Sequence, residues 1–348
     1  MVLKLSVDER LAPARLFPLL EQNGTHLGLL DKLVWRVGVL PSFREGLIST
    51  RERLLPLMSS QPAWGPGRVD TFNPYKLIQF GVRAADLTPE ERIGVADLPA
   101  VFEQGPRAGM NLHWDGNNAS LDERNLSAAI GAGVTPYTVD HQAIHRVADW
   151  LKTLTPPPSP NRPNGESVER GRAIYRNACA DCHGFQEPHH YVFEGKYLGQ
   201  VEPITRLRTD RARLDSYADW FRQRQIDELF AGTRYHFRHF RKTDGYANLP
   251  LDGLWLRGPY LHNGSVPTLA DLLKPPAERP RTFLRGLDLV DGVNGGFVSP
   301  SCDPATAADA KPFCFDTTLP GNGSGGHLYG VELAPANKAA LLAYLLTF

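Results

Sequence analysis

The first 178 residues of this 348-residue chain contain no cysteine, and only four are present in all. Methionine is equally scarce, because the three in the chain are Met1, Met58 and Met110. No uninterrupted run of 18 apolar residues occurs, so the sequence predicts no membrane-spanning helix. Lys and Arg number 38, as do Asp and Glu, and no basic stripe stands out. This balance argues against nucleic acid as a partner.

A secretory signal is not visible at the start of the chain either. Charges at Lys4, Asp8, Glu9 and Arg10 interrupt any apolar stretch, and no small-residue cleavage site follows them. The cysteine pattern described below nevertheless predicts a periplasmic or secreted protein.

The fold predicted from the sequence is mainly α, with long irregular loops. Glycine (32) and proline (29) are abundant, and helical spacing of apolar residues recurs while strand-type alternation is rare. Pro335 fits the first position of a final helix, and Thr268 with Asp271 fits a helix cap. A proline-rich linker, residues 156–165, divides the chain into predicted domains 1–155 and 166–348.

The second domain carries all four cysteines, and two of them form a short motif. Cys179-Ala180-Asp181-Cys182-His183 is C-x-x-C-H, the attachment signature of c-type haem. Two thiols at this spacing can form thioethers with two vinyl groups of one porphyrin, while the next imidazole reaches the iron. A thioredoxin-like dithiol would need a βαβ context, and a zinc site would need a second close cysteine pair. The motif therefore predicts one covalent haem.

The iron's second axial position has few candidate ligands. No methionine follows Met110, so this domain supplies none. Apart from His183, its histidines are His189, His190, His236, His239, His262 and His327. The first pair follows His183 too closely, and the second pair lies in an amphipathic segment. His262 and His327 both lie in glycine-containing loops, and either could be the second axial ligand of the iron. Each could equally be an ordinary turn residue that does not bind the iron.

Two further groups of residues each have a functional interpretation and an ordinary structural alternative. Cys302 and Cys314 enclose a loop that a disulfide would stabilise by about 3 kcal/mol in an oxidising compartment, and the alternative is two free thiols. Arg206, Arg208 and Arg211 could bind haem propionates, or form a solvated charged face.

Longer motifs resemble the bacterial di-haem cytochrome c peroxidase superfamily, most closely its rubber-oxygenase-type c-type cytochromes. In the second domain these are CADCH at 179–183, RGPYLHNGSVPTLADLL at 257–273 and FDTTLPGNGSGGHLYGVEL at 315–333. In the first domain, GPGRVD at 65–70 and HWDGNN at 113–118 resemble parts of the family's first haem domain. The resemblance implies two cytochrome c-like domains.

The resemblance also implies roles for particular residues. His327 occupies the position of the family's sixth ligand, so His183 and His327 would bind the iron. His262 would then line the haem edge or the domain interface. Trp114 would be an electron relay between haems, or else a packed core residue. A calcium ion between the domains is a further implication, with Asp97 as one ligand.

The family's first C-x-x-C-H is missing from this chain. We interpret this either as a start downstream of that motif and of a signal peptide, or as a mono-haem descendant. The predicted function is one-electron transfer with a redox partner protein or a small electron donor. The alternatives are a peroxidase or dioxygenase, which would need a second haem from a missing N-terminal segment, and a non-catalytic cytochrome domain. Whether the chain is an enzyme stays open.

Overall fold

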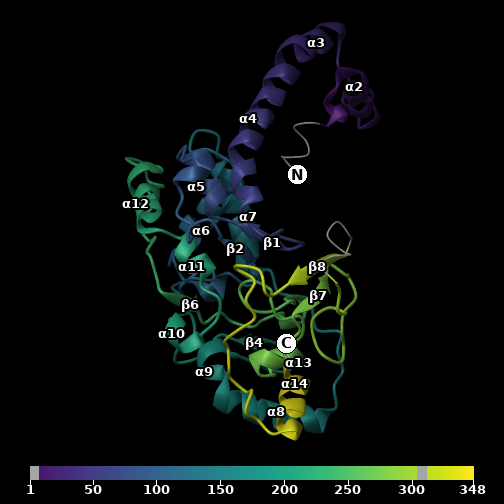
Figure 1. The fold of residues 1–348 in the computed structure, drawn as a ribbon, viewed down its shortest axis with the longest axis vertical. Helices are drawn as coiled ribbons and strands as arrows, with labels where there is room; N and C mark the ends of the chain where they lie inside the picture. The colour runs from purple at the N-terminus through teal and green to yellow at the C-terminus, as the bar shows by residue number, and fades with distance from the viewer. Residues whose placement is uncertain (1–7, 304–311) are drawn as a thin grey trace.

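The computed structural model describes residues 8–303 and 312–348 (Figure 1). The helices of the first half are η1 (Glu9–Leu11), α2 (Pro13–Gln22), α3 (Leu29–Val34), η2 (Trp35–Val39), α4 (Leu40–Ser59), α5 (Asn73–Gln79), η3 (Ala84–Asp86), η4 (Gly105–Arg107), α6 (Leu121–Gly131) and α7 (His141–Thr153). Helices α2 to α4 form an arm that stands away from the body, and the C-terminal end of α4 packs against α5 and η3 (Figure 1).

The second half has shorter helices and most of the strands. Its helices are α8 (Gly165–Ala178), α9 (Ala180–His183), α10 (Ile204–Leu207), α11 (Ala212–Ser216), α12 (Asp219–Glu228), η5 (Leu254–Leu256), α13 (Leu269–Leu272), η6 (Pro276–Glu278) and α14 (Pro335–Leu345). Thr268 Oγ1 accepts from the Asp271 amide at 3.0 Å, and Pro335 opens α14, which confirms both predicted helix starts.

Four antiparallel strand pairs lie between the helices. They are β1 (Arg68–Asp70) with β2 (Val95–Asp97), β3 (Phe185–Gln186) with β4 (Tyr191–Val192), β5 (Val201–Pro203) with β6 (Gly245–Ala247), and β7 (Thr282–Arg285) with β8 (Phe313–Asp316). Each pair is short, and β5 and β6 are joined by more than forty residues of intervening chain.

The predicted fold class is therefore wrong. Helices account for 42% of the described residues, and with the strand pairs they make a mixed α/β fold without a clear arrangement of two cytochrome domains. The physical reason is that glycine and proline break the chain into short extended pieces, and several of these, such as β5 and β6, pair with partners far along the sequence. The boundaries 1–155, 156–165 and 166–348 stay a prediction, although residues 154–164 do lie outside helices and strands.

The two halves of the chain share one aromatic core. Phe72 and Tyr75 of the first half pack with Tyr217 and Phe221 of the second, with ring centroids 4.8 Å apart for Phe72 and Tyr217 and 5.3 Å apart for Tyr75 and Phe221. At its edge, the Lys76 ammonium donates to the Ser216 carbonyl at 2.6 Å. A buried ion pair, Arg213 with Asp115 at 3.0 Å, joins the halves again.

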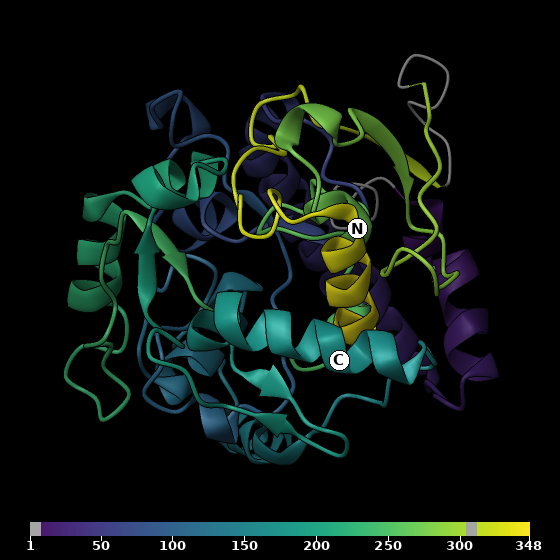
Figure 2. The ribbon, with the colours of Figure 1, turned by 90° about the horizontal axis from the view of Figure 1, so that it is seen from below.

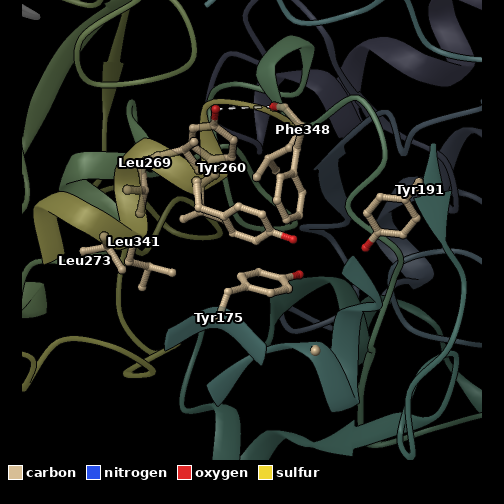
Figure 3. Close-up of a cluster of buried hydrophobic side chains, with 12 residues drawn as sticks. Tyr175, Tyr191, Tyr260, Leu269, Leu273, Leu341 and Phe348 are labelled. Carbon is tan, nitrogen blue, oxygen red and sulfur yellow. Dashed lines mark hydrogen bonds between the residues drawn. The ribbon is translucent and has the colours of Figure 1, made fainter. Parts of the chain in front are cut away.

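A second core forms where α14 crosses α8 (Figure 2). Tyr175 of α8 lies 5.3 Å from Tyr344 and 5.1 Å from Phe348, ring centroid to ring centroid. Figure 3 shows the hydroxyls of Tyr175 and Tyr191 turned toward each other in this cluster, whereas the Tyr260 hydroxyl points away from them, toward the Leu254 carbonyl. The crossing is close because Gly171 of α8 has no side chain at the point of contact with α14.

Replacing Gly171 with alanine should destabilise the protein by about 1–3 kcal/mol. A Cβ atom here would overlap the carbonyl oxygen of Ala340 and lie 2.9 Å from the Tyr344 Cβ, so the two helices would have to separate. Urea denaturation measures the change. Gly165→Ala in the same helix is the control, since no atom lies within 4 Å of the added Cβ. Equal stability of the two variants would contradict the close crossing.

Candidate functional site

The C-x-x-C-H motif sits at a break between two helices. Asn164 precedes α8 and its side chain caps the Glu166 and Ser167 amides, and Cys179 directly follows the end of the helix. One turn of helix, α9, follows and stops at Gly184, where φ is 71°. The left-handed conformation suits glycine, and it ends α9 directly after His183. The turn holds both thiols and the imidazole of the motif against one cavity.

That cavity has a volume of about 630 Å³ and is enclosed by residues from both halves of the chain. Cys179, Cys182, His183 and His327 line one part of it. Leucines form much of the remaining wall, including Leu207, Leu249, Leu272, Leu273, Leu341 and Leu345. A cavity of this size with mainly apolar walls and few polar groups is typical of a cofactor or ligand site.

His183 and His327 face each other across this cavity. Their ring centroids are 6.3 Å apart, and the ring planes differ by 41°. An iron bound to both rings needs two metal–nitrogen bonds of about 2 Å each, for which this separation leaves room. The two thiols of the motif belong to the same cavity wall, so these four residues fit a c-type haem.

The backbone fixes the orientation of the His183 ring. Its Nδ1 lies 2.8 Å from the carbonyl oxygen of Leu249, and a carbonyl can only accept, so Nδ1 carries the proton. Nε2 is left with a free lone pair, which is the form that binds a metal. Burial lowers the pKa of His183, which keeps the ring neutral at pH 7. The Tyr191 hydroxyl also donates to the His183 carbonyl.

His327 is held by an unusual backbone conformation. Its φ is 49°, which is uncommon for a residue with a side chain, and its amide donates to the Leu207 carbonyl at 2.9 Å. Gly326 precedes it with φ of 77°, and a Cβ there would overlap that same carbonyl. Burial, and then His183, lower the pKa of His327 to about 4. Its buried Nδ1 has no hydrogen-bond partner in the described part of the chain.

His262 lines the cavity but binds a protein neighbour. Its ring stacks on Tyr246 with centroids 4.1 Å apart, and its Nε2 lies 3.0 Å from the Tyr246 hydroxyl. Burial lowers its pKa well below the usual value. Trp114 lines the same cavity, and its Nε1 donates to the Asp97 carbonyl at 2.6 Å. The relay role of Trp114 stays a prediction.

Asp97, the suggested calcium ligand, is engaged by an arginine. The Arg285 guanidinium forms an ion pair with its carboxylate, and both side chains are almost fully buried. In residues 8–303 and 312–348 no group of three or more His, Cys, Asp or Glu side chains is arranged to bind a metal ion. Calcium between domains stays a prediction.

The arginine cluster at 206–211 lies elsewhere. Arg206 pairs with Glu202 and Arg211 with Asp215, both on the surface, and neither arginine lines the cavity. Four other arginines do line the cavity: Arg107, Arg124, Arg257 and Arg285. The resemblance places only the helix of Arg124 beside a haem, the family's first one, and predicts no site role for the other three. Arg257 is the first residue of the 257–273 motif and Arg285 follows that motif, but the sequence alone does not show that they are buried.

Two of these arginines share one buried carboxylate. Asp252 accepts from Arg107 at 2.5 Å and from Arg257 at 2.8 Å, and its side chain has no exposed surface. Because the interior is poor in water, these ion pairs hold the cavity wall in place only while each charge keeps its partner.

The other two cysteines confirm the expected disulfide. Cys302 and Cys314 are joined, so the strand β8 is tied to the segment that follows β7. No helix of the described residues is long and apolar enough to cross a membrane.

Comparison with known proteins finds a family match in this region. The family described as RoxA-like, cytochrome c-like matches residues 245–284. The matched segment contains Leu249, which orients His183, and the motif from Arg257 to Leu273. This match supports a relationship to RoxA-like c-type cytochromes. Membership of the di-haem peroxidase superfamily and loss of a first haem motif stay predictions.

Two relatives come from Sinorhizobium fredii (strain NBRC 101917 / NGR234). Uncharacterized protein y4iM is 30% identical over 252 residues, covering 67% of this chain and 57% of that protein. Uncharacterized protein y4iJ is 29% identical over 294 residues, covering 66% of this chain and 48% of that protein. The chain therefore spans about half the length of these relatives.

Replacing Asp252 with asparagine should destabilise the fold by about 3–5 kcal/mol, because Arg107 and Arg257 would both lose their carboxylate inside the protein. Chemical denaturation followed by circular dichroism measures the loss. Asp86→Asn breaks the exposed pair with Arg83 and should change stability little. A comparable loss in both variants would show that burial of the Asp252 pair is not what matters.

Proposed function

We propose that this chain is a c-type cytochrome that binds one haem covalently through Cys179 and Cys182 and transfers single electrons. The observation that carries the proposal is the pair of facing imidazoles, His183 and His327, 6.3 Å apart beside the two thiols of the motif. The family match supports a c-type cytochrome independently of this geometry.

The residues of the chain prepare the site for such a group. The Cys179 and Cys182 thiols would add to the two vinyl groups as thioethers. His183 presents Nε2 because Leu249 holds its Nδ1 proton, and His327 presents its ring from the opposite wall. When bound, the haem would supply an iron that cycles between two oxidation states. Two histidine ligands favour a lower reduction potential than a histidine–methionine pair.

Electrons would enter and leave close to His327. Tyr329 lies 5.3 Å from the His327 ring, lines the cavity and is 41% exposed, and the neighbouring Leu328 is 40% exposed. The cavity therefore approaches the surface beside one proposed axial ligand. A redox partner protein or a small electron donor could exchange an electron at this edge without entering the apolar interior.

The proposed location is the periplasm or the outside of the cell. The disulfide between Cys302 and Cys314 supports an oxidising compartment, because cytosolic thiols are kept reduced. Covalent attachment of haem to two thiols is consistent with the same compartment.

Replacing His327 with alanine should convert a six-coordinate, low-spin haem to a high-spin form, since the iron loses one nitrogen donor. Absorption spectroscopy of the purified, matured protein measures this. His262→Gln is the control, because His262 hydrogen-bonds Tyr246 and should not bind iron. A low-spin spectrum that persists in the His327 variant, or that is lost in the His262 variant, would overturn the ligand assignment.

Replacing both Cys179 and Cys182 with alanine should abolish covalent attachment, so that acid–acetone extracts any haem from the protein. Intact-protein mass spectrometry measures the missing adduct. Cys302→Ser breaks the disulfide with Cys314, outside the cavity, and should leave the haem adduct in place. Wild-type protein without a haem adduct after maturation would refute the proposal itself.

A further inference from the structure

One arginine in the cavity wall has no acidic partner. Arg124 of α6 lines the cavity, and its recorded contact is a weak hydrogen bond to the Asn125 side chain at 3.3 Å. Within residues 8–303 and 312–348, no carboxylate forms an ion pair with it. The other three arginines of the wall differ, because Arg107 and Arg257 bind Asp252 and Arg285 binds Asp97.

The charges around Arg124 leave an excess of positive charge. Asp252 balances only one of Arg107 and Arg257, and the nearby Glu103 has a pKa that burial raises. Burial lowers the pKa of Arg124 to about 10, so the guanidinium of this partly buried side chain is still charged at pH 7. An uncompensated buried charge is costly, and a planar guanidinium pairs best with a carboxylate or a phosphate.

A neutral histidine lies near the same end of the cavity. His113 lines the wall, and its Nδ1 lies 2.6 Å from the Asn117 side-chain oxygen. Because that oxygen can only accept, Nδ1 carries the proton and Nε2 is an acceptor. Nε2 has no partner among the described residues, and the φ of His113 is 64°, a conformation that needs support from its surroundings. An ionised carboxylate has no proton to donate to this nitrogen, so the Arg124 guanidinium alone would hold the carboxylate.

The wall next to these polar groups is apolar. Leu98, Ala100, Val101 and Phe102 line the cavity in one continuous segment, and Leu121 adds to it from α6. Leu98 is 64% exposed and Val101 is 41% exposed, so this segment reaches the surface. A molecule bound here would need an acidic head and an apolar body.

We infer that Arg124 anchors the carboxylate of an amphipathic carboxylic acid in this cavity, with the apolar body of the acid lying along Leu98–Phe102. Two sources can supply this chemistry. One is a propionate of the haem proposed to bind at Cys179 and Cys182, and that source rests on the proposed function. The other is a free monocarboxylic acid, and binding of this acid does not rest on the proposed function.

Titration of the matured protein with sodium octanoate, followed by isothermal calorimetry, tests the free acid. Arg124→Gln should weaken octanoate binding by about tenfold to a hundredfold, since a charge-assisted contact is lost. Arg124→Lys keeps the charge and should weaken it less. Octanol, which has the same body without the carboxylate, should bind the wild type and the Arg124→Gln variant equally.

The same variants test the haem propionate. If the propionate occupies the site, octanoate will not bind the wild type, and Arg124→Gln will lower the haem midpoint potential because a positive charge near the iron is lost. Arg124→Lys should keep a potential near the wild-type value. The inference fails if octanoate binds wild type and Arg124→Gln equally, or if octanoate does not bind and the potential is the same in both. An unchanged Soret band in the variants shows that the haem site itself is intact.

Discussion

The crossing of α8 and α14 is the contact on which the proposed haem site depends. The motif with both thiols begins at the end of α8, and His327 lies a few residues before α14, so the packing of these two helices sets the distance between the facing imidazoles. Gly171 allows the helices to approach this closely, and the tyrosines beside it fill the crossing.

The second constraint is electrostatic. Four arginines border a mainly apolar cavity, and three of them pair with two buried carboxylates, Arg107 and Arg257 with Asp252 and Arg285 with Asp97. Such pairs define the shape of the wall more than they stabilise the fold, because desolvation offsets most of the attraction. Among the four arginines, Arg124 alone has no carboxylate partner in the described part of the chain, so it is the one that indicates most about a bound ligand.

The sequence could predict the local chemistry but not the architecture. The haem motif and the disulfide depend on cysteines close in sequence, and His327 was identified through a resemblance of a longer segment. The mainly α fold class was wrong because strands such as β5 and β6 pair across more than forty residues, and no periodicity reveals a partner at that distance. Arg107 and Asp252 were missed for the same reason, since they are 145 positions apart.

The shared aromatic core has a consequence for how the chain behaves when it is cut. Phe72 and Tyr75 precede the proline-rich segment, while Tyr217 and Phe221 follow it, and they pack in one cluster. A protease that cleaves between residues 156 and 164 would therefore produce a nicked protein whose two fragments stay bound to each other. Neither fragment expressed alone could cover its aromatic side chains, so each would aggregate or recruit the other.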